Sequence, residues 1–368
     1  MEVEARTPQL TSLNDKAASA PVSRRVFLVM LAGISLVTGL NAGLVRLGVW
    51  APVVNGRLAD LHGPLMVLGF MGSLISLERA QALRNRLAYA APILLGAGAV
   101  VLISGLFPVL GRLLLFDGTL AFVAVMVALY RRAPLPLVAA QVVGAVLACL
   151  AAALLVVVEI AALVPLLAGF IVVTIAAERA ELAQLTMGPR AVPTLVAASA
   201  WLSLAAVSAL LWPGTGDRLF GAGALFVALW LLRDDVGRRL IRSEGLRRYN
   251  AAALLLGNTW LAVAGLTWVV VGRPVATGHY DVVVHGTFLG FAMSMIMAHA
   301  PIIFPTVLAR PLPYRPAMWV PLTVLHLGML VRVIGALTGT ILYQIGGAMT
   351  VVSILLFAAT AIYSAVRA

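Results

Sequence analysis

The chain has 368 residues, of which 62% are hydrophobic and only 11% are charged, and its mean hydropathy is +1.04. Soluble domains use roughly 45–50% apolar and ~25% charged residues, so the composition excludes an ordinary soluble protein and predicts one that lies in a lipid bilayer. The net charge of +12 is interpreted through its arginines as a marker of topology, and no nucleic-acid partner is expected. The single cysteine, Cys149, excludes a disulfide framework and a thiolate metal site.

The chain divides into a polar tail, residues 1–22, and a transmembrane domain, residues 23–368. A helix needs about 20 apolar residues to cross ~30 Å of hydrocarbon. Twelve expected spans lie near 26–48, 61–78, 88–108, 112–130, 135–158, 161–178, 192–212, 218–232, 250–272, 281–305, 318–338 and 341–366. The eighth is short and the third and fourth are closely joined, so ten or eleven spans are the alternatives.

Basic residues are distributed unequally over the two sides of these spans. Twenty lysines and arginines fall on the side of the N-terminus and five on the opposite side, while Arg332 lies within the eleventh span. Because basic residues are retained on the cytoplasmic side, both termini are expected to be cytoplasmic, in a bacterial-type inner membrane.

One sequence pattern recurs on the second, sixth and tenth expected spans. It consists of Gly-Phe, an isoleucine five residues after the phenylalanine, and a polar position three residues later. The copies are Gly69 to Arg79, Gly169 to Arg179 and Gly290 to Ala300, ending in Glu-Arg, Glu-Arg and His-Ala. The pattern predicts an all-α polytopic protein of three parallel four-helix repeats, about 23–132, 133–248 and 249–368, around a pseudo-threefold axis. The alternative is a chance match of common residues.

All five histidines, His62, His279, His285, His299 and His326, fall in or beside expected spans. Ionisable residues inside a membrane are costly and indicate functional sites, and neutral imidazole is a common ligand of haem iron and copper. His62 and His285 both begin spans at the outer side, at matching depth, so the sequence predicts that they are opposed axial ligands of one haem. The alternative is that the histidines are hydrogen-bonded packing residues.

His299 follows His285 by 14 residues, about 21 Å along a helix, and therefore cannot bind the same iron. It falls in the layer of Glu78 and Glu178, where it is predicted to bind a second metal or to handle protons. The alternative is a polar helix end before Pro301.

His326 and Arg332 share the eleventh span, with the arginine about 9 Å nearer the outer face. A buried arginine requires an anion, which the sequence assigns to a haem propionate. The alternatives are pairing with Asp281 or Asp117, or extension of the side chain to the interface. His326 is a competing haem ligand and, with His299, a candidate for the second metal, for which copper is considered.

The segment from His285 to Phe291 has the pattern H-x4-GF, and the segment from His62 to Phe70 has the same pattern with two extra residues. With twelve spans in groups of four, it resembles the catalytic subunit of the haem–copper oxidase superfamily and its smaller relative, the nitric-oxide-response family NnrS. The resemblance implies a b-type haem and a redox or nitric-oxide-related function. The sixth and seventh spans contain no histidine, so the oxidase copper site is not expected.

The expected function is therefore that of a haem-binding membrane protein resembling a degenerate oxidase subunit, and an oxidoreductase if it is an enzyme. Catalytic residues are not assigned. Respiratory or cytochrome subunits are expected partners besides the lipid bilayer. The alternative is a membrane transporter, or a structural subunit of a respiratory complex without its own cofactor.

Overall fold

The computed structural model describes residues 21–182 and 187–368, and every regular element in these ranges is a helix. Of the predicted tail, 1–22, only the last two residues are described. Eleven helices in the described ranges are long and apolar enough to cross a membrane. The chain is thus an all-α, multi-pass integral membrane protein.

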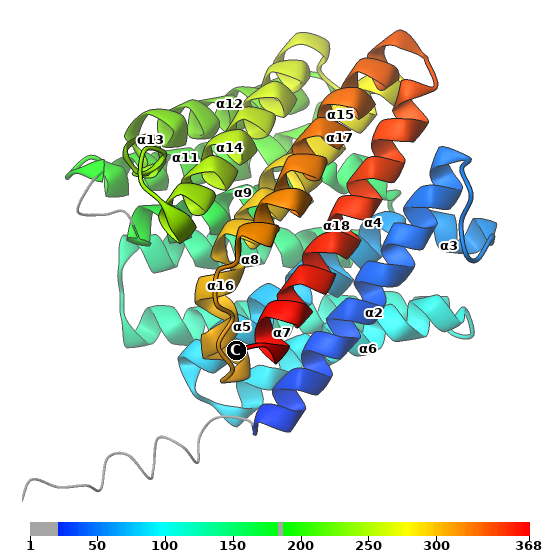
Figure 1. Cartoon of the computed structure of the whole chain (residues 1–368). Coiled ribbons are helices and arrows are strands. Elements are labelled where there is room, and N and C mark those ends of the chain that lie inside the picture. The colour runs from blue at the N-terminus through cyan, green and yellow to red at the C-terminus, as the bar shows by residue number, and fades with distance from the viewer. Residues whose placement is uncertain (1–20, 183–186) are drawn as a thin grey trace, which may run out of the picture.

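The long helices follow the predicted spans closely (Figure 1). They are α2 (Val22–Leu47), α6 (Ala90–Ser104), α7 (Pro108–Arg132), α8 (Pro136–Leu154), α9 (Ile160–Leu182), α11 (Ala191–Leu211), α12 (Thr215–Asp234), α14 (Gly245–Val271), α17 (Trp319–Thr338) and α18 (Leu342–Val366), together with a composite helix, Thr277–Leu308. Short helices α3 (Gly56–Asp60) and α13 (Gly237–Leu240) lie in the connections, whereas η2 (Arg86–Tyr89) and η4 (Pro316–Met318) continue directly into α6 and α17.

The expected span at 61–78 is not among the eleven, and it is divided into three pieces. These are α4 (His62–Pro64), the π-helix η1 (Leu65–Gly72) and α5 (Ser73–Leu83), which follow one another without a break. The composite helix Thr277–Leu308 is built in the same way from α15 (Thr277–His285), the π-helix η3 (Gly286–Met293) and α16 (Ser294–Leu308). A π-turn adds a residue to the helical repeat and often occurs at functional sites.

The third and fourth expected spans are separate helices despite their short connection. Helix α6 ends at Gly105, whose φ of 72° lies in the left-handed region that glycine adopts without strain. Helix α7 begins with Pro108, which suits the first turn because its missing N–H would have no partner there. Glycine and proline therefore reverse the chain within a few residues.

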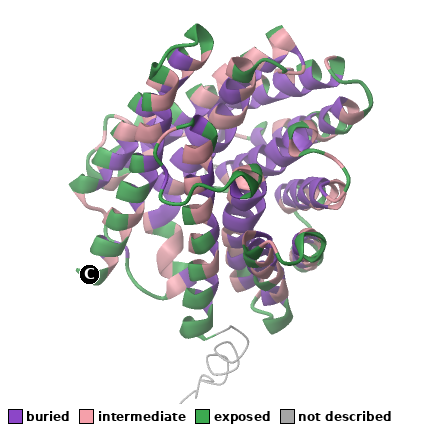
Figure 2. Ribbon diagram, turned by 90° about the vertical axis from the view of Figure 1, so that its right-hand side faces the viewer, coloured by how far each residue is buried: buried purple, intermediate pink, exposed green. Residues whose placement is uncertain are grey.

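Three helices occupy the centre of the bundle. In the most apolar part of α9, 83% of the residues are buried, against 33% in the corresponding parts of α2, α7 and α18. Nearly all residues of η1 and η3 are buried as well. Figure 2 shows buried residues concentrated in the interior and exposed residues along the outer faces. A helix that is apolar on all sides can be covered on all sides, which places α9 and the two π-containing helices in the core.

The outer helices contact one another as neighbours in a closed ring. Helix α7 packs on α8, α12 packs on α14, and α18 packs on α2. The beginning of α2 and the C-terminal end of the chain lie at the same end of the bundle (Figure 1). The core helices are therefore surrounded by a closed layer of helices.

Candidate functional site

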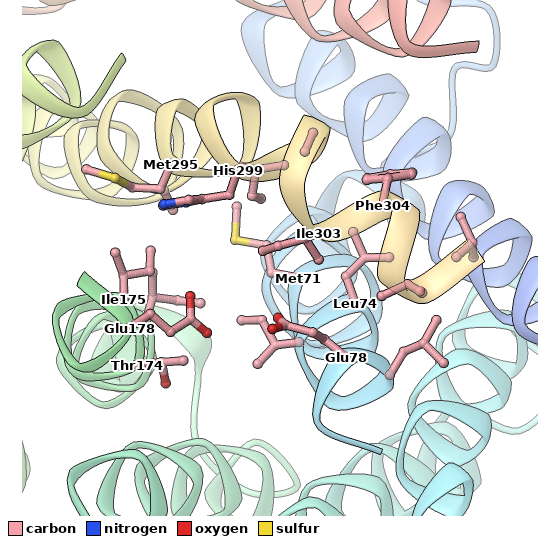
Figure 3. Close-up of a pocket in the computed structure, with 18 of the residues that line it drawn as sticks. Met71, Leu74, Glu78, Thr174, Ile175, Glu178, Met295, His299, Ile303 and Phe304 are labelled. Atoms are coloured by element: carbon pink, nitrogen blue, oxygen red, sulfur yellow. The ribbon is translucent and has the colours of Figure 1, made fainter. Parts of the chain in front are cut away.

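Two cavities lie between the same three core helices. The first, which we call the histidine cavity, has a volume of about 230 Å³ and is lined by residues that include His62 and His285. The second, the glutamate cavity, has a volume of about 110 Å³ and is lined by residues that include Glu78 and Glu178 (Figure 3). Met71 lines both cavities, so the two spaces follow one another along the core.

The imidazole rings of His62 and His285 face each other in the histidine cavity. Their centroids are 6.1 Å apart and their planes are inclined by 30°. His62 Nδ1 lies 2.7 Å from the carbonyl oxygen of Gly39, and His285 Nδ1 lies 3.2 Å from that of Asp281. Because a carbonyl oxygen only accepts hydrogen bonds, each Nδ1 carries the proton and each Nε2 presents a lone pair.

The π-helices begin close to the two histidines. His285 is the last residue of α15, directly before η3, and His62 opens α4, three residues before η1. In a regular α-helix each residue is rotated by 100° from the one before it, so counting from the repeated Gly-Phe pairs places the two histidines on different faces of their helices. This count does not apply through a π-helix. The two rings meet in the structure, because helices at different positions around a site can reach it from different faces.

The side chain of Arg332 is paired with Asp281. Arg332 Nε and Nη2 donate to Asp281 Oδ2 and Oδ1 at 2.8 and 2.7 Å, and the Tyr343 hydroxyl donates to Oδ1 at 3.1 Å. His285 Nδ1 is 3.0 Å from the same Oδ1, and Arg332 Nη2 is 3.2 Å from His285 Nε2. One buried carboxylate thus holds the arginine and orients the histidine.

This pairing supplies an anion for Arg332 from within the chain, whereas the haem propionate assigned to it stays a prediction. The sequence places Asp281 at the membrane boundary, but α15 begins at Thr277, so Asp281 lies one turn inside the helix and is only 3% exposed. Of the alternatives considered for Arg332, pairing with Asp281 is the one that the structure contains. The arginine needs no further anion to balance its charge.

His326 lies outside the histidine cavity, and both its ring nitrogens have partners. Trp260 Nε1 donates to His326 Nδ1 at 2.9 Å. His326 Nε2 is 3.3 Å from Ser294 Oγ, which itself donates to the Gly290 carbonyl oxygen. These contacts are those of a hydrogen-bonded packing residue, and the structure does not bring His326 to the pair as a competing ligand.

His299 lines the glutamate cavity, where charged side chains link the core helices. Arg179 Nη1 is 3.1 Å from His299 Nε2, and the same guanidinium donates twice to Asp235. Arg79 of α5 forms an ion pair with Glu178 of α9. In residues 21–182 and 187–368, no three His, Cys, Asp or Glu side chains gather as metal ligands would, and His299 and His326 do not share a cavity.

Asp281 and Tyr343 are site residues that the sequence did not assign. The spacing between Asp281 and His285 is one helical turn, D-x3-H, which would have indicated a carboxylate that orients the histidine. Tyr343 reaches the same carboxylate from α18. No local pattern could have shown that contact.

These features define a multi-pass helical membrane protein with a half-buried histidine pair at one end of its core. The chain belongs to the DUF8744 family, described as a domain of unknown function, whose profile matches residues 25–366. No curated protein matches the sequence, and no solved structure matches it.

Proposed function

We propose that this protein binds one b-type haem through His62 and His285 and has a redox function. The observation that carries the proposal is the separation of the two rings. Imidazoles on opposite sides of one metal ion have centroids about 6 Å apart, because each metal–nitrogen bond is about 2 Å and each nitrogen lies about 1 Å from its ring centre. The 6.1 Å between His62 and His285 matches that geometry.

The donor atoms also suit a metal. Histidine ligands usually donate their second N–H to a carbonyl or carboxylate oxygen, which fixes the tautomer and the ring orientation. Gly39 serves His62 in this way and Asp281 serves His285. Ligation through His285 Nε2 requires Arg332 to release its contact with this nitrogen, while its two bonds to Asp281 remain.

Apolar side chains that suit a flat apolar group form much of the remaining wall, which also contains Arg46 and Asp60. The apolar side chains include Met66, Val67, Leu167, Phe288, Leu289 and Met293. When bound, haem would supply a one-electron redox couple. Because His62 and His285 would both hold the haem iron, this arrangement would support electron transfer rather than binding of nitric oxide or oxygen. Respiratory or cytochrome subunits are the partners that such a role requires.

Purified protein expressed with a haem supply is expected to show a Soret band and a low-spin ferric electron paramagnetic resonance signal. His62→Ala and His285→Ala should each abolish the low-spin signal, because each removes one strong-field ligand. His326→Ala is the matched control and should retain it, since both nitrogens of His326 bond to protein groups. A full low-spin haem in both ligand variants would show that the site lies elsewhere.

The proposal includes three four-helix repeats with both termini in the cytoplasm. Two observations support it. Helix α7 contacts α8, α12 contacts α14 and α18 contacts α2, and the arginine position of one unit meets the glutamate position of the next, as in the pair of Arg79 and Glu178. The interrupted helix from His62 to Leu83 would then be the twelfth span.

Cysteine labelling tests this topology. In a Cys149→Ala background, Val54→Cys is expected to react with a membrane-impermeant maleimide on intact cells, whereas Arg132→Cys should react only after permeabilisation. The two positions lie at opposite ends of spans and are exposed. Labelling of both from the same side would contradict the topology.

A transporter without its own cofactor is the second candidate. The observation in its favour is the pair of cavities that follow one another between the core helices and share Met71. Ionisable side chains line both, as in many membrane pathways. Absence of haem from protein expressed with a haem supply would favour this function.

A further inference from the structure

The repeated sequence pattern places Arg79, Arg179 and Ala300 at equivalent positions of its three copies. Arg79 contacts the next copy through an ion pair with Glu178. Arg179 in turn contacts the following copy through His299, at 3.1 Å. The third contact of this series would join residue 300 to the first copy, but the side chain of Ala300 is too short and has no charge to make it.

The residue left without that contact is Glu78. Its nearest cationic neighbour is Arg79, at 3.7 Å, and it accepts no hydrogen bond from any of residues 21–182 or 187–368. Arg79 is engaged by Glu178, and Arg179 is engaged by Asp235. The two arginines are thus each engaged by another carboxylate, which leaves Glu78 with the longer contact to Arg79, at 3.7 Å, as its ion pair within the described residues.

The glutamate cavity lies at the position of the missing arginine. Glu78 and Ala300 both line it, and Figure 3 shows the carboxylates of Glu78 and Glu178 facing each other across the space below His299. Most of the remaining wall is apolar and includes Leu74, Ile75, Ile303, Phe304 and Val307. Its volume of about 110 Å³ is of the order of that of a cavity of ~150 Å³ that binds benzene.

We propose that the glutamate cavity binds a small organic cation, an ammonium or guanidinium group on a short apolar body. The charged group lies against Glu78 and the body lies along Leu74, Ile303 and Phe304. The Glu78 side chain is 26% exposed, and a carboxylate withdrawn to this extent from water is stabilised by a partner of opposite charge. The apolar walls favour an organic cation over a hydrated metal ion. The inference is independent of the haem proposal and holds for haem-free protein.

Ethylguanidinium and ethylammonium are suitable probes for the full chain purified in detergent. Calorimetry is expected to show saturable binding, accompanied by a rise in the thermal unfolding temperature, because a ligand of the folded state stabilises it. Glu78→Gln should weaken binding about tenfold or more, equivalent to about 1.4 kcal/mol. Glu244→Gln, at the exposed start of α14, removes the same charge outside the cavity lining and should leave binding unchanged.

Two substitutions at Ala300 separate charge from volume. Ala300→Arg supplies the missing cation and is expected to abolish probe binding while raising the unfolding temperature of the ligand-free protein. Ala300→Leu fills the space without a charge and should abolish binding without that rise. It also keeps the test valid if the arginine variant does not fold.

The same cationic group could come from solution or from an ethanolamine lipid. Binding of the probe in both phosphatidylcholine and phosphatidylethanolamine nanodiscs would indicate a soluble amine, and binding only in the former would indicate a lipid headgroup. Absence of probe binding in detergent, or equal affinity of wild type and Glu78→Gln, would overturn the proposal and leave a proton on Glu78 as the balancing charge.

Discussion

Replacing Asp281 with alanine is expected to lower the free energy of unfolding by about 3–5 kcal/mol, the usual cost of removing one partner of a buried ion pair. Arg332 would keep its charge in the core without the two bonds that it donates to Asp281. His285 and Tyr343 would lose the same acceptor. Unfolding of the detergent-solubilised protein, followed by circular dichroism against denaturant, measures this loss.

The double variant Asp281→Leu/Arg332→Leu should be less destabilised than either single variant, because it buries no unpaired charge. Asp117→Ala is the matched control: Asp117 is exposed on α7, and its removal should change stability by no more than about 0.5 kcal/mol. If Asp281→Ala unfolds like the wild type, the buried pair does not contribute to stability as the structure indicates.

The spans could be predicted from the sequence because the bilayer imposes a length and a composition on each helix. The expected stretches 192–212 and 341–366 correspond to α11, Ala191–Leu211, and α18, Leu342–Val366. The division of the second span was not predicted. A π-turn changes hydrogen-bond partners by one residue without changing composition, so hydropathy contains no sign of η1 or η3.

The depth of the site residues in the membrane could be predicted from the sequence, but the contacts between their side chains could not. Counting residues from the start of each span placed His62 and His285 at one level, and the structure brings them within 6.1 Å. The choice of anion for Arg332 depended on where α15 begins, a boundary that hydropathy locates only within a few residues. The partners of His326 are on α14 and α16, and a tertiary contact of this kind leaves no local pattern.

Gly346 of α18 allows the close approach of helices that positions Arg332. A Cβ atom at residue 346 would collide with the backbone nitrogen of Arg332 and would lie 2.6 Å from the Gly328 carbonyl oxygen. Both atoms belong to the backbone of α17, so neither can move aside without separating the helices. Gly346→Ala is therefore expected to destabilise the protein by about 1–3 kcal/mol, the usual cost of overpacking.

The matched control is Gly33→Ala on α2, where a Cβ atom would meet no other heavy atom within 4 Å. The same substitution should stabilise there by about 0.5–1 kcal/mol, because alanine restricts the unfolded chain more than glycine does. The two variants thus differ in the sign of the shift in unfolding temperature. In Gly346→Ala, the displaced Arg332 should also perturb the pairing of Asp281 with His285, so we expect a lower haem content than in Gly33→Ala. Equal unfolding temperatures for the two variants would contradict the close crossing of α17 and α18.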